Sequence, residues 1–302
     1  MDSVVNALTV SLYEGLVFGL LSIGLFMTFR VLDFPDLTME GSFPLGGAVA
    51  ATLIARGGLN PLLATLVALF AGAAAGAVTG LLNTKLRITA LLSGLIVMVG
   101  LYSVNLNIMS GANISLLREN TIFKMVGNAL NISGIWLSIV VAAIAAAIFF
   151  FILRWFLQTE IGLALRASGN NEQMVRGMGA DTNKNIVITT AIANALVATA
   201  GALIAQNQGF SDVGMGIGVV VVGLAAVIIG EALFRPRTIT QILLAAFGGT
   251  FIYRLFITVA LRVGMPPQDL RLVTAALVVL ALAIPFARKK LAGEWLPPAT
   301  RS

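Results

Sequence analysis

Residues 159–184 read TEIGLALRASGNNEQMVRGMGADTNK, and this polar stretch stands between two long runs that are almost wholly apolar. With 58% hydrophobic and 11% charged residues and a mean hydropathy of +0.97, the chain is too apolar for a soluble globular domain. The apolar runs predict a polytopic membrane protein. The polar stretch predicts two short helices, separated by a break near Gly169, Asn170 and Asn171. We expect these helices to lie in water and to form a docking element.

Apolar runs of about 20 residues, the length that crosses a bilayer, recur along the chain. We expect an all-α transmembrane domain over residues 1–302 with about nine spans, within a range of about eight to ten. The expected spans cover residues 4–29, 38–55, 61–82, 89–109, 134–157, 184–207, 214–230, 238–261 and 269–287.

The distribution of Lys and Arg predicts the orientation. Alternate spans place most cations on one side: Arg30, Lys85, Arg87, Arg154, Arg166, Arg176, Lys184, Arg235, Arg237, Arg288, Lys289 and Lys290. The other side holds fewer: Arg56, Arg118, Lys124, Arg262 and Arg271. Because cytoplasmic loops are enriched in cations, we expect the N-terminus outside and the C-terminus and polar stretch in the cytoplasm. The net charge of +6 then reflects topology and not affinity for nucleic acid.

Residue usage argues against an enzyme. The chain has no Cys and no His, so zinc and redox chemistry are not expected, and no metal site is predicted. No catalytic constellation of other residues stands out. The chain also lacks a G-x-x-x-x-G-K-[ST] phosphate loop, so any ATP and Mg²⁺ would be bound by separate subunits and no cofactor by this chain.

Two short segments share an F-x-D-x-x-M pattern. Phe34, Asp36 and Met39 form one copy, and residues 210–215 repeat it before a later span. Because the copies precede spans of opposite predicted direction, we expect an inverted repeat with halves 1–157 and 184–287. Residues 158–183 would connect these halves.

Charged side chains within the spans are costly in hydrocarbon and call for a role. Glu14 and Arg254 are the candidates in the first and eighth expected spans. An intramembrane ion pair is the favoured interpretation, and contact with a solute is the alternative.

A polar cluster lies where the first span ends and the second begins. Pro35 predicts a helix break, after which Asp36 or Thr38 could cap the next helix. The alternative is a solute pathway lined by polar groups whose burial would otherwise be unexplained: Asp36, Thr38, Glu40, Asn105, Asn107, Asn194, Gln206 and Asn207. The small-residue stripe of Gly72, Gly76 and Gly80 predicts close helix packing within the chain, with a dimer face as the alternative.

The polar stretch resembles the cytoplasmic coupling segment of ABC-importer permeases of the branched-chain amino acid and ribose type. That segment has the pattern T-x-x-G-x-x-x-R-A followed by N and a G-[IM] pair, matched here by Thr159, Gly162, Arg166, Ala167, Asn170, Gly177, Met178 and Gly179. LDFPDLTMEGSFPLGGAVAA at residues 32–51 and LYSVNLNIMSGANISLL at residues 101–117 are similar to an amino-acid permease subgroup of the tryptophan or tyrosine type. The chain lacks the N-F-A-H-G-[DE] string of branched-chain amino acid permeases.

This resemblance implies a type II-like importer permease in a bacterial inner membrane. Its partners would be a second copy of the chain, two cytoplasmic ATPase subunits and an extracytoplasmic solute-binding protein, and its solute an amino acid or related small molecule. Ile161, Leu165, Met174 and Val175 would enter an ATPase groove, while Arg166, Glu172 and Arg176 would make contacts at its rim.

Three alternatives remain open, one of which is a binding or scaffold membrane protein without transport. The polar stretch could instead be an interfacial amphipathic helix. The whole chain could also be a secondary transporter coupled to protons through Glu14 or Asp36.

Overall fold

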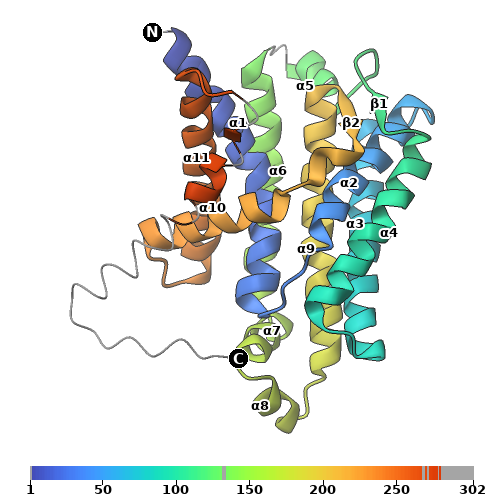
Figure 1. Cartoon of the computed structure of the whole chain (residues 1–302), viewed down its shortest axis with the longest axis vertical. Helices are drawn as coiled ribbons and strands as arrows, with labels where there is room; N and C mark the ends of the chain where they lie inside the picture. The colour runs from blue at the N-terminus through green and yellow to red at the C-terminus, as the bar shows by residue number, and fades with distance from the viewer. Residues whose placement is uncertain (1, 131–133, 267–268, 271, 278, 280–302) are drawn as a thin grey trace.

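The computed structural model describes residues 2–130, 134–266, 269–270, 272–277 and 279. In chain order the elements are α1 (Asp2–Leu25), the π-helical turn η1 (Phe26–Val31), α2 (Met39–Ala55), α3 (Pro61–Leu86), α4 (Ala90–Met109), β1 (Asn113–Ser115), α5 (Ile122–Leu130), α6 (Ile135–Gln158), α7 (Glu160–Asn170), α8 (Glu172–Gly177), α9 (Thr182–Gln208), β2 (Phe210–Asp212), the 3-10 turn η2 (Val213–Gly216), α10 (Val219–Phe234) and α11 (Ile239–Arg262). Long helices form a bundle whose two ends carry different small elements (Figure 1).

Within the described residues, seven helical segments are long and apolar enough to cross a membrane. They are Leu8–Val31, Pro61–Leu86, Ala90–Met109, Ile135–Gln158, Thr182–Gln208, Val213–Phe234 and Ile239–Arg262. The expected span 38–55 corresponds to α2, an apolar helix of only 17 residues. The expected span 269–287, with Arg271 and the C-terminal cations, lies mostly outside the described residues, so the total of about nine stays a prediction.

Helix α9 occupies the middle of the bundle and packs against α1, α2 and α3. The glycine stripe of α3 allows the backbones to approach closely. A Cβ atom added at Gly76 would lie 2.1 Å from the Thr190 carbonyl oxygen, and one added at Gly72 would lie 2.5 Å from the Asn194 carbonyl oxygen. The prediction that this stripe packs within the chain is therefore confirmed. Because lipid tails are as apolar as Leu, such close packing supplies much of the helix association energy in a bilayer.

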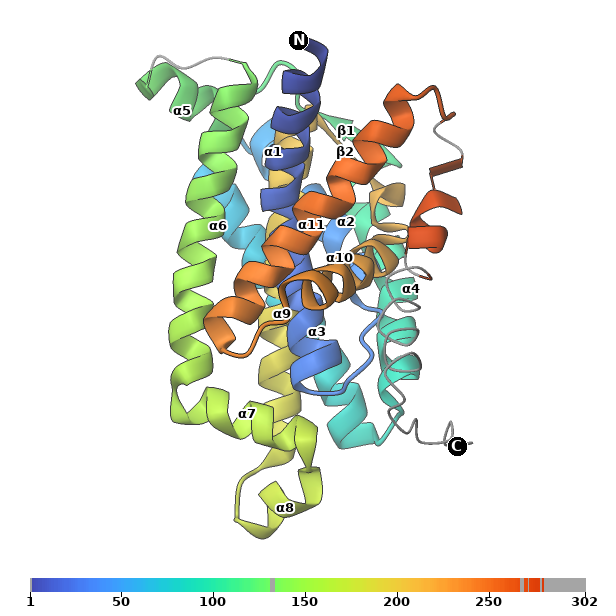
Figure 2. The same ribbon diagram turned by 90° about the vertical axis from the view of Figure 1, so that its left-hand side faces the viewer.

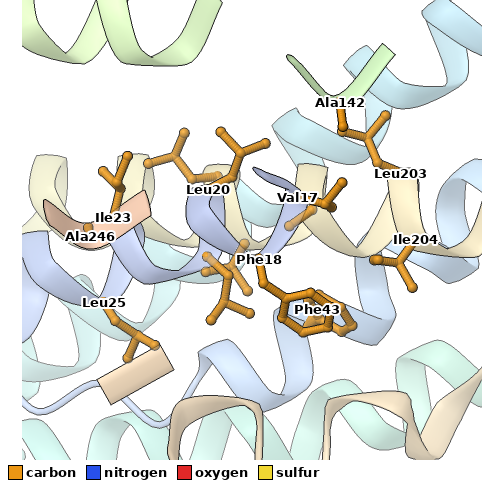
Figure 3. Packing of buried hydrophobic residues seen from close by; sticks show 14 of the residues in the cluster. Val17, Phe18, Leu20, Ile23, Leu25, Phe43, Ala142, Leu203, Ile204 and Ala246 are labelled. Carbon is orange, nitrogen blue, oxygen red and sulfur yellow. The ribbon is translucent and has the colours of Figure 1, made fainter. Parts of the chain in front are cut away.

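The largest apolar cluster joins α1 to six other helices, α2, α5, α6, α9, α10 and α11, and Figure 3 shows part of it. Phe18 of α1 and Phe43 of α2 lie with ring centroids 5.7 Å apart. Around them α6 contributes Ala142, α9 contributes Leu203 and α11 contributes Ala246 (Figure 3). The N-terminal helix is thereby held against both early and late parts of the chain.

Two of the apolar helices do not run the length of the bundle. Helix α2 begins partway along it, after the irregular link that Pro35 introduces, and α10 lies across the long axis in both views (Figures 1 and 2). Each follows one of the repeated F-x-D segments, and the two segments form the same turn. Asp36 Oδ1 accepts from the Thr38 N–H at 2.9 Å, and Asp212 Oδ1 accepts from the Gly214 N–H at 2.7 Å. The turns match, while the inverted relation of whole halves stays a prediction.

The two ends of the bundle differ. One end holds α7 and α8, and the opposite end holds the start of α1, α5 and the β1–β2 pair (Figures 1 and 2). Strand β1 pairs with β2 antiparallel, with Asn113 opposite Asp212. Among the described residues the all-α class therefore holds except for these two three-residue strands.

Candidate functional site

The predicted coupling segment folds as two short helices set beneath α6 and α9 (Figure 2). Thr159 caps α7, because its Oγ1 accepts from the Gly162 N–H at 3.3 Å. A Cβ atom at Gly162 would lie 2.3 Å from the Phe156 carbonyl oxygen, so the corner between α6 and α7 needs a glycine. Asn171 caps α8 by accepting from the Met174 N–H at 2.9 Å. Side-chain caps therefore define where both helices begin.

Burial separates the apolar residues of this segment into two groups. Leu165 and Val175 are buried within the chain, whereas Ile161 and Met174 are about half exposed and Met178 is 78% exposed. Entry of Leu165 and Val175 into an ATPase groove stays a prediction, and their packing inside this chain does not favour it. Their helical spacing identified an apolar face but not the surface that covers it. Met178 is the exposed apolar side chain that the predicted set of contacts omitted.

Polar side chains tie the segment to the start of α9. Arg176 forms an ion pair with Glu172 at 2.6 Å and donates from Nε to Thr182 Oγ1 at 2.6 Å. Asp181 caps α9, and the backbone N–H of Lys184 lowers the pKa of this carboxyl below its ordinary value. Arg176 is thus an internal bridge as well as a candidate contact at the rim of a partner.

The remaining predicted coupling residues have different surroundings. Arg166 and Ala167 are half-buried, and the Arg166 Nε atom is buried without a hydrogen-bond partner. Asn170 is exposed at the end of α7. Gly177 has open space around it, and Gly179 has a φ of +86°, a conformation that favours glycine.

A direct backbone contact joins α7 to the end of η1. A Cβ atom at Gly169 would lie 1.9 Å from the Val31 carbonyl oxygen, so the two backbones touch. The neighbouring Arg30 of η1 forms an ion pair with Glu231 of α10. π-helical turns are rare and often occur at functional sites. The sequence marked Gly169 only as a helix breaker, and nothing in the local pattern indicates its partner.

Asp36 lies at the centre of a buried polar network. Asp36 Oδ2 accepts from Asn194 Nδ2 at 2.6 Å, and Asn194 Oδ1 accepts from Ser42 Oγ at 2.7 Å. The hydroxyl groups of Thr38 and Thr79 are 2.6 Å apart, and all five residues are fully buried. The network therefore ties the start of α2 to α3 and α9. Asp36 accepts from the N–H of Thr38, whose side chain forms no cap, so the helix-break interpretation accounts for Asp36.

The other predicted pathway amides do not join this network. Gln206 accepts from the Ile122 N–H at 3.0 Å and donates to Thr65 at 2.8 Å, which fixes α5 and α3 to α9. Asn107 and Asn207 are exposed. Two further members, Asn105 and Glu40, line a separate cavity.

Glu14 and Arg254 lie together between α1 and α11. Arg254 Nη1 is 3.2 Å from Glu14 Oε2, and the guanidinium carbon stands 3.5 Å from the centroid of the Phe18 ring. Both a carboxylate and an aromatic face therefore stabilise the cation. This geometry gives the pair a structural role in holding the two helices.

A cavity of about 300 Å³ opens between α2, α4 and the η2 region. Helix α2 contributes Glu40, Gly41 and Pro44, and residues 213 and 217 close the side near η2. Helix α4 contributes Met98, Val99, Tyr102, Ser103 and Asn105. Among the described residues, no group of three or more carboxylates is placed to hold a metal ion.

Comparison with known proteins places this architecture in a family. The permease component of branched-chain amino acid transport systems matches residues 7–282. A tyrosine transport system permease protein of Clostridioides difficile is 37% identical over 283 residues, or 94% of this chain and 91% of that protein. An uncharacterized protein of Rickettsia prowazekii is 31% identical over 282 residues, or 92% of this chain and 97% of that protein.

A more distant relative is the ribose import permease protein RbsC of Escherichia coli, 29% identical over 175 residues, or 56% of this chain and 51% of that protein. No solved structure matches. The tyrosine and ribose relatives are permease components and not enzymes, which confirms both the resemblance and the non-enzyme prediction. The chain is a multi-pass membrane protein that belongs to the family of permease components of branched-chain amino acid transport systems.

Proposed function

We propose that this chain is the permease subunit of a binding-protein-dependent ABC importer that moves an amino acid into the cytoplasm. Membership of the permease family and the identity with a tyrosine transport permease support the solute class. The sequence has no phosphate loop of its own, which fits a subunit driven by separate ATPases that bind ATP and Mg²⁺.

The observation that carries the proposal is the unit formed by α7 and α8 at one end of the bundle (Figure 1). It presents exposed apolar side chains, Ile161, Met174 and Met178, on a scaffold tied to α9 and η1. A short apolar protrusion with charged neighbours fits a groove on a partner protein. An ATPase that grips this unit would move α9 and η1 with it.

The remaining partners follow from the arrangement of the two ends. One chain supplies one coupling segment, and ABC ATPases act in pairs, so a homodimer is the simplest assembly. The excess of cations near the coupling segment supports its cytoplasmic location and an extracytoplasmic N-terminus, in a bacterial inner membrane. The opposite end, with α5 and the β1–β2 pair, would then receive the solute-binding protein.

Capture of the ATPase tests this function. The tagged chain, expressed with the proteins encoded beside it, should retain an ATPase after solubilisation. Met178→Asp should reduce that capture by about tenfold or more, because a charge would enter an apolar contact. Met265→Asp is the matched control, since Met265 is also exposed but follows α11.

The contrary outcomes are distinct. Equal capture of the ATPase by the Met178→Asp and Met265→Asp variants would show that α7 and α8 do not contact the ATPase. Solute uptake by the purified chain alone, driven by a proton gradient, would replace the ABC function with secondary transport.

A further inference from the structure

The cavity between α2, α4 and the η2 region is lined by an acidic side chain without a basic one among the described residues. Glu40 is the single carboxyl group among its described lining residues. Among the residues of the structure that are described, no Lys or Arg lines the cavity, so a solute with only negative groups would be repelled there. We infer that this cavity is a solute site in which Glu40 binds a protonated amine, an inference that rests on the proposed transport of amino acids.

Glu40 is held in place without a cationic partner. Its Oε1 accepts from the Gly218 N–H at 3.2 Å, next to the start of α10. None of the four ion pairs between described residues includes Glu40. The backbone therefore orients the carboxylate while its negative charge stays available to a ligand.

Asn105 of α4 supplies a second acceptor among the lining residues. Its side chain is fully buried, and Nδ2 donates to the Gly41 carbonyl oxygen at 3.2 Å, which fixes the amide. The Oδ1 atom has no hydrogen-bond partner. A buried carbonyl oxygen without a donor is costly, and a primary ammonium carries three N–H donors. An ammonium group could therefore donate to either the unsatisfied Asn105 oxygen or the Glu40 carboxylate.

The rest of the wall suits an apolar body. Met98, Val99, Pro44 and Ile217 line the cavity, and its volume of about 300 Å³ is at the small end of ligand pockets. Tyr102 and Ser103 are exposed, so the cavity can be reached from the outer face of α4. The fitting ligand is one small molecule with an ammonium group and an apolar or aromatic side chain.

The absence of Cys from the chain allows a direct test of the charge. Ser103→Cys in the full chain, purified in detergent, places a thiol in the cavity wall. A methanethiosulfonate reagent with an ammonium group should react about tenfold faster than one with a sulfonate group, because Glu40 attracts the first and repels the second. Taking the ratio of the two rates cancels any change in the reactivity of the thiol itself.

Glu40→Gln should abolish this preference, and Glu40→Asp should restore most of it. Glu119→Gln, which removes a carboxylate outside the cavity, is the matched control and should leave the preference intact. Val99→Cys provides a second reporter if Ser103→Cys does not fold. A preference that persists in Glu40→Gln would overturn the site.

Protection by small molecules tests the ligand class. Labelling should slow with L-phenylalanine and with phenethylamine but not with phenylpropionate, which lacks the amine. Equal protection by phenylpropionate, or none by any of the three, would refute amine recognition. Because labelling uses the chain alone, it can succeed where ATPase capture fails, and the two proposals are judged separately.

Discussion

At Asp36 the bundle holds a carboxylate that is satisfied without a cation. One oxygen accepts from the Thr38 N–H and the other from Asn194 Nδ2. The first contact follows from the sequence, because an Asp side chain commonly accepts from the backbone N–H two residues further on. The second joins residues 158 positions apart, and no local pattern indicates it. Residue types thus predict that a polar group needs a partner, but only the fold identifies the partner.

The ion pair between Glu14 and Arg254 gives a prediction at this scale. Glu14→Gln should lower the free energy of unfolding by about 2 kcal/mol, since it leaves a guanidinium that is only 16% exposed without its carboxylate. The contact with Phe18 should keep the loss from being larger. The shift in thermal unfolding in detergent measures the effect.

The double variant Glu14→Gln/Arg254→Met is the control for that ion pair. It should be less destabilised than the sum of its two single variants, because neither partner remains unpaired. Additive losses would show that the two side chains act independently.

At the scale of elements, the contact between α7 and η1 can be tested with Gly169→Ala, and Gly177→Ala in the same segment is the matched control. Gly169→Ala should force α7 away from η1, because a Cβ atom would lie 1.9 Å from the Val31 carbonyl oxygen. We expect capture of the ATPase to persist while solute-stimulated ATP hydrolysis falls by about tenfold. Gly177→Ala, which meets nothing within 4 Å, should leave both unchanged.

Equal activity of these two variants would show that the contact between α7 and η1 does not transmit motion. Loss of ATPase capture in Gly169→Ala would instead indicate that the contact only positions the docking surface. Measuring capture and hydrolysis on the same preparations separates the two.

The elements also show where sequence reasoning stops. Capping residues such as Thr159 and Asp181 are visible in the sequence, and the structure uses both. The β1–β2 pair is not visible, because strands of three residues are too short to show a period of two. Similarly, hydropathy detects the length of residues 213–234 but carries no information on direction, so the crossing orientation of α10 could not be predicted.

For the whole molecule, the orientation in the membrane can be tested with single thiols. Leu117→Cys and Met178→Cys place exposed thiols near opposite ends of the helix bundle, in a chain that has no Cys of its own. A membrane-impermeant thiol reagent should label Leu117→Cys in intact cells and Met178→Cys only in inside-out vesicles, because cations concentrate near the coupling segment. The reverse pattern would contradict an extracytoplasmic N-terminus.

The central place of α9 has a consequence for how the chain is made. Its principal neighbours, α1, α2 and α3, all leave the ribosome before it. Until residues 182–208 are synthesised, the glycine face of α3 lacks the α9 backbone against which it packs. The early helices therefore remain in the bilayer without their contacts to α9. Such late, long-range assembly is slow. Premature termination before α9 should therefore yield fragments that proteases degrade faster than the full chain.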